Sequence, residues 1–132
     1  MTVEPRPALR RFLMDRSAAT AAEFALVVPV FLLIVFGTIN TAITMSAIIQ
    51  MHYAAERAAR CLSVNVTGAC TAANVDTYAK TFYNGPAITG LTFTRTTPVC
   101  GNKVVGTGTY EMLTGFSSTS VNLSASACYP VI

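Results

Sequence analysis

Residues 18–51 read AATAAEFALVVPVFLLIVFGTINTAITMSAIIQM and carry the strongest structural signal in the chain. After Glu23 no charged residue occurs from Phe24 to Met51, a run of 28 residues. As an α-helix this run is about 42 Å long, whereas the hydrocarbon core of a bilayer is about 30 Å thick and needs roughly 20 apolar residues. The run therefore predicts a membrane-spanning helix, with the span itself at about residues 21–45.

The segments on either side of the run differ in charge. Residues 1–18 contain four Arg and two acidic side chains. A basic segment next to an apolar span stays in the cytoplasm, so the distal part is expected on the other side of the membrane. Only 11% of the whole chain is charged, and no dense Lys/Arg surface follows the span. A nucleic-acid-binding protein is therefore not expected.

A cleaved secretory signal peptide is the first alternative to a lasting membrane span. Its apolar region is about 7 to 15 residues long and ends in an A-x-A-like site. The run here is longer, and cleavage sites ending at Ala42 or Ala47 have Asn40 or Met45 at the −3 position. The sequence therefore favours a membrane helix.

The helix is predicted to continue beyond the membrane, through QMHYAAERAARCLS, to about Leu62. Alanine is a strong helix former, and Glu56 and Arg60 have favourable i,i+4 spacing. One face carries apolar side chains that can bury a distal domain; its positions are 51, 54, 55, 58 and 62. The predicted helix thus covers residues 19–62.

The remaining residues, 63–132, predict a small domain of mixed structure. Asn74 is expected to cap a short helix over residues 75–83, which Asn84-Gly85-Pro86 ends. Period-two alternation then predicts three strands, at about 88–97, 103–113 and 119–129, joined by hairpins. The predicted fold class is α+β. A long N-terminal membrane-spanning helix precedes a small disulfide-bonded domain with a short helix and a three-stranded antiparallel β-meander.

Four cysteines lie after the membrane run, at positions 61, 70, 100 and 128, and allow three pairings. No CxxC motif occurs, so a redox dithiol or a zinc site has little support. A turn centred near residues 115–116 places residue 103 opposite about residue 128. Cys100 then lies near Cys128, which leaves Cys61 to pair with Cys70. Each bridge is expected to contribute about 2–4 kcal/mol.

No catalytic arrangement is visible in the sequence. His52 is the only histidine, lies on the emerging helix and has no metal-ligand partner at helical spacing. Gly106-x-Gly108 lies between strand residues rather than before a helix, so it does not resemble a phosphate loop. Asp76 and Glu111 are single acids without visible partners. We therefore expect no enzymatic activity, no catalytic residues, no metal and no cofactor.

The stretch from Arg16 to Asn40 resembles the TadE-like family of pilin-related proteins, which belong to the tight-adherence (Tad, or Flp) branch of type IV pilus systems. The matching features are a basic leader, a small-residue junction, the sequence Glu-Phe-Ala-Leu from Glu23, and Pro29 five residues after Phe24. The pattern of residues 110–130, with SVNLSASACYP at its end, also looks like the family.

This resemblance implies processing by a prepilin peptidase. Such cuts leave Glu at mature position five, which places the cut between Ala18 and Ala19 and makes residues 1–18 a cleaved cytoplasmic leader. The family usually has Gly before the cut, where this chain has Ala18.

The resemblance also implies an assembly role for Glu23, Phe24 and Pro29. Glu23 would pair with the free N-terminal amine of an adjacent subunit and set the axial register. The alternative is an interfacial Glu, wetted by headgroup water and favoured near a helix N-terminus. Pro29 is expected to kink the helix or to loosen one turn.

The function implied by the resemblance is that of a minor pilin or pseudopilin. It would assemble through its helix with other pilin-like subunits and with the assembly machinery, help to initiate or cap a pilus, and support surface adhesion. The expected location is the bacterial inner membrane, with a cytoplasmic N-terminus and a periplasmic C-terminus, or an extracellular pilus. The alternative is an unprocessed single-pass membrane protein whose outer domain is a binding or scaffold module.

Overall fold

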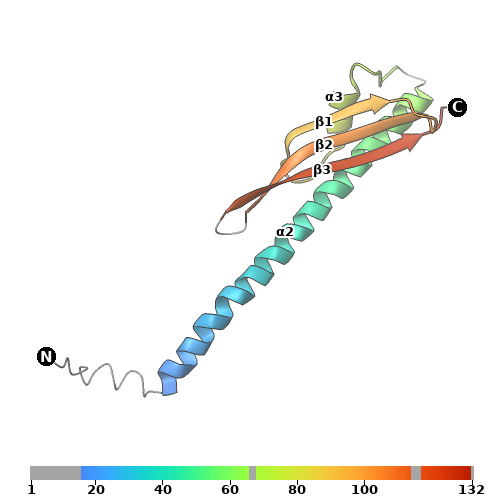
Figure 1. Cartoon of the computed structure of the whole chain (residues 1–132). Coiled ribbons are helices and arrows are strands. Elements are labelled where there is room, and N and C mark those ends of the chain that lie inside the picture. The colour runs from blue at the N-terminus through green and yellow to red at the C-terminus, as the bar shows by residue number, and fades with distance from the viewer. Residues whose placement is uncertain (1–15, 66–67, 114–116, 132) are drawn as a thin grey trace. The chain divides into compact units, whose positions relative to one another are not determined.

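The structure is a computed structural model that describes residues 16–65, 68–113 and 117–131. Its elements follow the predicted order (Figure 1), and they are α2 (Arg16–Val64), α3 (Val75–Lys80), β1 (Thr89–Thr96), β2 (Asn102–Leu113) and β3 (Ser118–Tyr129). The chain divides into two compact units, Met1–Thr38 and Ile39–Ile132. The predicted fold class is confirmed, whereas residues 1–15 of the predicted leader lie outside the described residues.

The long helix α2 continues without interruption through Pro29 and ends at Val64, two residues beyond the predicted end. After it, the Asn65 backbone N–H still donates to the Cys61 carbonyl at 2.9 Å. The Asn65 side-chain amide then donates to the Cys70 carbonyl at 2.8 Å, which ties the following loop to the end of the helix. The expected ion pair between Glu56 and Arg60 is not formed in the described part of the chain, where both side chains are exposed.

The short helix α3 ends at Lys80, so the prediction that it reaches residue 83 is wrong. The next three backbone N–H groups bond to carbonyls three residues back instead of four, which tightens the chain into a turn. The predicted side-chain cap is also wrong. Asn74 occupies the N-cap position but makes no cap hydrogen bond, because its Oδ1 accepts from the Thr71 N–H at 2.6 Å and from the Thr71 hydroxyl at 3.1 Å.

The three strands form one antiparallel sheet in the order β1-β2-β3. Lys103 faces Cys128, which is the register that the position of the turn predicts. The outer face carries hydroxyl and amide side chains, and hydrogen bonds between them join neighbouring strands, from Thr92 to Thr107 and from Thr109 to Asn122. The alternation of Thr and Ser with apolar residues therefore corresponds to an outer, exposed face and an inner face.

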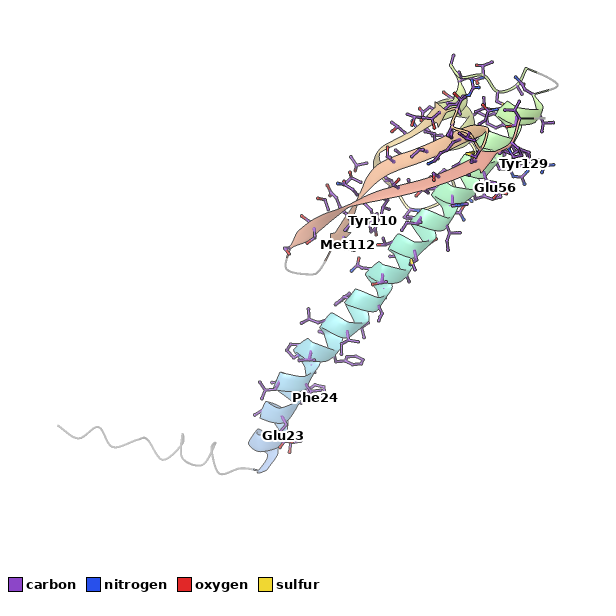
Figure 2. All side chains as sticks on the ribbon, turned by 45° about the vertical axis from the view of Figure 1, so that its right-hand side comes forward. Glu23, Phe24, Glu56, Tyr110, Met112 and Tyr129 are labelled. Atoms are coloured by element: carbon purple, nitrogen blue, oxygen red, sulfur yellow. A yellow bond between two sulfur atoms is a disulfide. The ribbon has the colours of Figure 1, made fainter. Side chains whose placement is uncertain are left out.

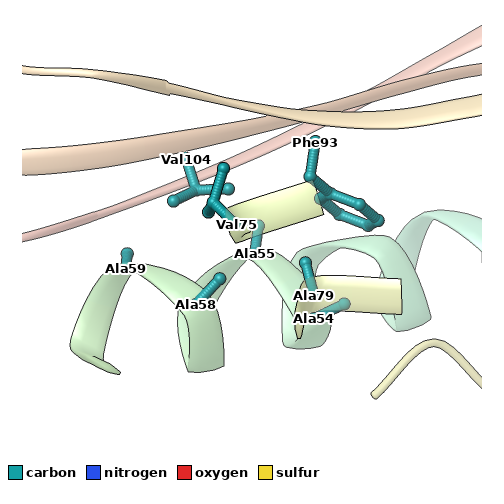
Figure 3. Packing of buried hydrophobic residues seen from close by; sticks show 8 residues of the cluster. All are labelled: Ala54, Ala55, Ala58, Ala59, Val75, Ala79, Phe93 and Val104. Atoms are coloured by element: carbon teal, nitrogen blue, oxygen red, sulfur yellow. The ribbon is translucent and has the colours of Figure 1, made fainter. Parts of the chain in front are cut away.

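The inner face packs against α3 and against the second half of α2 (Figure 3). Eight residues form the main buried cluster: Ala54, Ala55, Ala58, Ala59, Val75, Ala79, Phe93 and Val104. Phe93 is 2% exposed and lies over its neighbour in the sheet, Gly106. The predicted apolar face of the helix is thus the face that the head covers. We use the word head for residues 63–131, within the described ranges.

A second buried cluster extends the contact along α2 toward the first turn of the second unit. It consists of Ala47, Met51, Leu123 and Ala125. Beyond it, the Thr44 hydroxyl contacts the Met112 sulfur at 3.7 Å, near the end of β2. Figure 2 shows Met112 and Tyr110 on this part of the sheet. The described contacts of the head on α2 therefore include Thr44 as well as the second cluster.

Candidate functional site: the apolar segment of α2

The part of α2 before Thr44 is apolar, and most of its described side chains are exposed. By length and composition, α2 from Thr20 can cross a membrane, and none of its most apolar 18-residue window is buried within the chain. Phe24 is 70% and Leu26 77% exposed. An exposed apolar surface of this extent indicates a lipid or protein environment around the helix.

The apolar segment of α2 comprises residues 21–43 and ends next to Thr44, which contacts Met112. A helix of this length measures about 34 Å, close to the roughly 30 Å of a hydrocarbon core. The segment therefore has the length of one crossing of a bilayer, and the predicted span of 21–45 includes Thr44.

The predicted processing and assembly residues all lie in α2. Ala18 and Ala19 belong to its first turn. Glu23 and Phe24 follow within the next turns, and both side chains are exposed (Figure 2). Pro29 is exposed too and lies inside the helix. Because its ring nitrogen carries no hydrogen, the carbonyl of Ala25 lacks its usual helical donor.

Two hydroxyl groups in this part of α2 are satisfied within the helix. The Thr38 hydroxyl donates to the Val35 carbonyl at 2.8 Å, and the Thr44 hydroxyl donates to the Asn40 carbonyl at 2.8 Å. Such bonds reduce the cost of placing a hydroxyl in lipid.

Asp76 has two partners in the structure, whereas the sequence alone showed none. Its Oδ2 accepts from Lys80 Nζ at 2.7 Å, and its Oδ1 accepts from the Phe93 backbone N–H at 2.8 Å. Partial burial raises the pKa of Asp76, but the two hydrogen bonds and the charge of Lys80 outweigh it, so that the pKa lies below its ordinary value. The i,i+4 spacing of Asp76 and Lys80 is a signal that sequence reasoning missed.

Two disulfides hold the ends of the head's elements. Cys61 is joined to Cys70 and Cys100 to Cys128, with Cα–Cα distances of 6.0 and 6.3 Å. This is the pairing that the strand register predicts. The first bridge ties the loop after α2 to the helix, and the second ties the β1–β2 turn to β3.

The described residues contain no group of three or more His, Cys, Asp or Glu side chains that could hold a metal. His52 is exposed on the outer side of α2. The described surface presents an apolar helix, an acid near the start of that helix and a polar sheet.

Comparison with known proteins identifies the helical part. Residues 18–60 match the family model described as TadE-like protein. No curated protein and no solved structure matches the chain. The match begins at Ala18 and ends in the part of α2 that carries the head. Residues 18–60 are therefore similar to the TadE-like family, which the sequence resembles, and α2 is long and apolar enough in the described residues to cross a membrane once.

Proposed function

We propose that the chain is a minor pilin, or pseudopilin, that is processed between Ala18 and Ala19 and joins pilin-like subunits through α2. The observation that carries this proposal is the largely exposed apolar segment of residues 21–43, which has Glu23 near its start and lies within the TadE-like match. The segment is long enough to span the bilayer before assembly and apolar enough to enter a helical bundle. The role is to help initiate or cap the pilus and thereby to support adhesion.

The hydrophobic effect supplies little driving force for moving the helix from lipid into a bundle, since lipid chains and apolar side chains are similarly apolar. Close packing and charge pairing must then favour the bundle. Gly37 supports this proposal, since small residues on a membrane helix let a neighbouring helix approach closely. Glu23 supplies the charge for the amine of the next subunit. The head contributes lateral contacts and no chemical step.

Processing is tested on protein isolated from its native membrane. Mass spectrometry of the N-terminus is expected to show a start at Ala19, and this start should disappear when the prepilin peptidase is deleted. The cleaved chain has five basic and four acidic residues, a net charge of +1. An intact N-terminus in the presence of the peptidase would contradict processing and favour the unprocessed membrane-anchored scaffold.

Assembly is tested separately, by crosslinking to pilin-like subunits in cells. Glu23→Gln keeps the size of the side chain and removes its charge, so crosslinking should fall about tenfold if a charge-assisted contact is lost. Gly37→Phe should also reduce it, because the ring keeps a second helix away. Glu111→Gln, an exposed acid of the head, is the matched control and should have no effect. Equal crosslinking of all three variants would contradict assembly through α2.

A further inference from the structure

Strand β1 lies at an edge of the sheet (Figure 1), and part of its outer side is open. The Phe93 N–H points away from β2, because it donates to Asp76 on α3. Backbone groups of an antiparallel strand alternate in direction with a period of two. The N–H and C=O of Arg95 therefore point to the same outer side, and the Asp76 carboxylate ends the open edge at Phe93.

A groove of about 480 Å³ runs beside this open edge. One wall consists of the second half of β1 and the residues after it, 93–97. The other wall consists of the loop before α3 and its first turn, with Ala72, Ala73 and Val75. Small side chains on this wall leave room for an extended backbone next to β1.

The side chain of Arg95 is held in place by a chain of hydrogen bonds. Its Nε donates to Asn102 Oδ1 at 2.9 Å, and the Asn102 amide donates to the Ser63 hydroxyl at 3.0 Å. That hydroxyl donates to the Tyr129 carbonyl at 3.1 Å. Asn102 is only 2% exposed. This network links α2 with all three strands, and it uses only one of the nitrogen donors of Arg95.

The charge of Arg95 is not neutralised by the described part of the chain. No described carboxylate lies within ion-pair distance of the Arg95 guanidinium. The Asp76 carboxylate, which also lines the groove, pairs with Lys80 instead. A positioned guanidinium with terminal N–H groups to spare is suited to a carboxylate, which it can bind through two parallel hydrogen bonds.

We propose that this groove binds an extended acidic segment of a partner protein, which adds as a strand to β1 and places an Asp or Glu on Arg95. Backbone hydrogen bonds to the open edge supply the pairing, and the charge selects the segment. The carboxylate of the bound segment lies at the Arg95 end of the groove, because the Asp76 carboxylate repels it at the Phe93 end. The proposal goes beyond assembly through α2 and assigns a separate contact to the head.

A second copy of the chain is a less suitable occupant. Two β1 edges paired about a two-fold axis at Arg95 would place two arginines opposite each other, and like charges in that position destabilise a sheet. The other role for a charge on an edge strand is to prevent aggregation. The two roles differ in what happens when an acidic peptide is added.

The test uses the full chain, labelled with ¹⁵N, in detergent micelles. The probe is a synthetic peptide of alternating Val and Thr with one central Glu, and its twin has Gln in that place. NMR titration with the Glu peptide should shift the amides of Arg95 and Thr97. The Gln twin should bind about tenfold more weakly, as expected for one lost charge-assisted contact.

Arg95→Gln should weaken binding of the Glu peptide about tenfold and remove the difference between the two peptides. Lys103→Gln, a charge change on β2, is the control and should leave binding unchanged. The NMR spectra of both variants report whether the head remains folded. The proposal is overturned if the Glu peptide produces no shifts in β1, if both peptides bind equally well, or if Arg95→Gln aggregates without any change in peptide affinity.

Discussion

Gly106 lacks a side chain because the ring of Phe93 occupies the space beside it. A Cβ built on Gly106 lies 2.6 Å from Phe93 Cε1, closer than side chains tolerate. Gly106→Ala is therefore expected to lower the free energy of unfolding of the head by about 1–3 kcal/mol, the usual cost of overpacking. Urea unfolding of the full chain in detergent, followed by circular dichroism, measures this change.

The matched control for Gly106 is Ser124→Ala, an exposed position on the outer face of the same sheet. Its effect should stay within about 0.5 kcal/mol, as is usual for surface substitutions. If both variants unfolded at the same urea concentration, Phe93 would not require the glycine.

Asp76 makes the stability of the head depend on pH in the acidic range. Its pKa in the folded chain lies below the ordinary value of 3.8. Its contribution is therefore fully present above that value, and it is lost as the pH falls through the lower, folded-state pKa. Asp76→Asn should flatten this acidic part of the stability curve. Above pH 5 this substitution should lower the free energy of unfolding by only about 1 kcal/mol, because the ion pair with Lys80 is exposed to solvent.

Urea midpoints between pH 2 and pH 7 measure the effect of Asp76. Glu111→Gln is the control, because this acid is exposed on β2, and its curve should keep the acidic slope. An unchanged slope in Asp76→Asn would show that other carboxyl groups cause it.

Single-residue contacts were the least predictable part of the molecule. Arg95, Asn102 and Ser63 are joined by hydrogen bonds across 39 positions of sequence. The periodicity of the sequence does not indicate such a contact, because the contact depends on how the strands lie on the helix. The Asn74 prediction was wrong for a related reason, since a nearby loop N–H took the oxygen that was expected to cap α3.

The helix α2 uses small side chains where it meets the head. Ala54, Ala55 and Ala58 are fully buried, so the sheet and α3 can approach the helix closely (Figure 3). Ala58→Leu inserts three carbon atoms into this contact and should destabilise the head by about 1–3 kcal/mol. The same urea unfolding experiment measures it. Glu56→Leu, on the exposed side of the same turn (Figure 2), should have little effect, and similar losses in both variants would contradict the packing.

Elements with strong periodicity were predicted well. Period-two alternation located the strand boundaries to within one residue, and one turn position was enough to place Lys103 opposite Cys128. The end of α3 was not predictable in the same way. Tyr83 continues the apolar pattern, but its hydroxyl donates to the Pro86 carbonyl at 2.6 Å, within a turn that is already too tight for an α-helix.

At the scale of the whole molecule, one helix belongs to two environments. Before Thr44 most of its described side chains are exposed, and after it the alanine face forms part of the core of the head. Composition alone predicted the first environment, because charge is absent over a long run. The second followed from the spacing of apolar residues. The sequence could not predict the contact between Thr44 and Met112, because this contact depends on how the sheet lies on the helix.

Because the alanine face of α2 forms part of the core of the head, we can predict which fragments of the chain fold. A piece with residues 39–132 keeps the alanine face and should unfold cooperatively in mild detergent. A piece with residues 63–132 lacks the helical half of the core, and a single core in so small a domain rarely supplies much stability. Urea unfolding and near-ultraviolet circular dichroism should show no cooperative transition for the shorter piece.

The shorter piece also loses Cys61, so the comparison must separate packing from the disulfide. Residues 63–132 with Cys70→Ser should be compared with residues 39–132 carrying Cys61→Ser and Cys70→Ser. Both pieces then keep only the Cys100–Cys128 bridge. The longer piece should retain a cooperative transition at reduced stability, because the loss of a bridge costs about 2–4 kcal/mol but leaves the core in place. If the two pieces unfolded alike, the alanine face of α2 would not be part of the folding unit, and the head would fold independently of the helix.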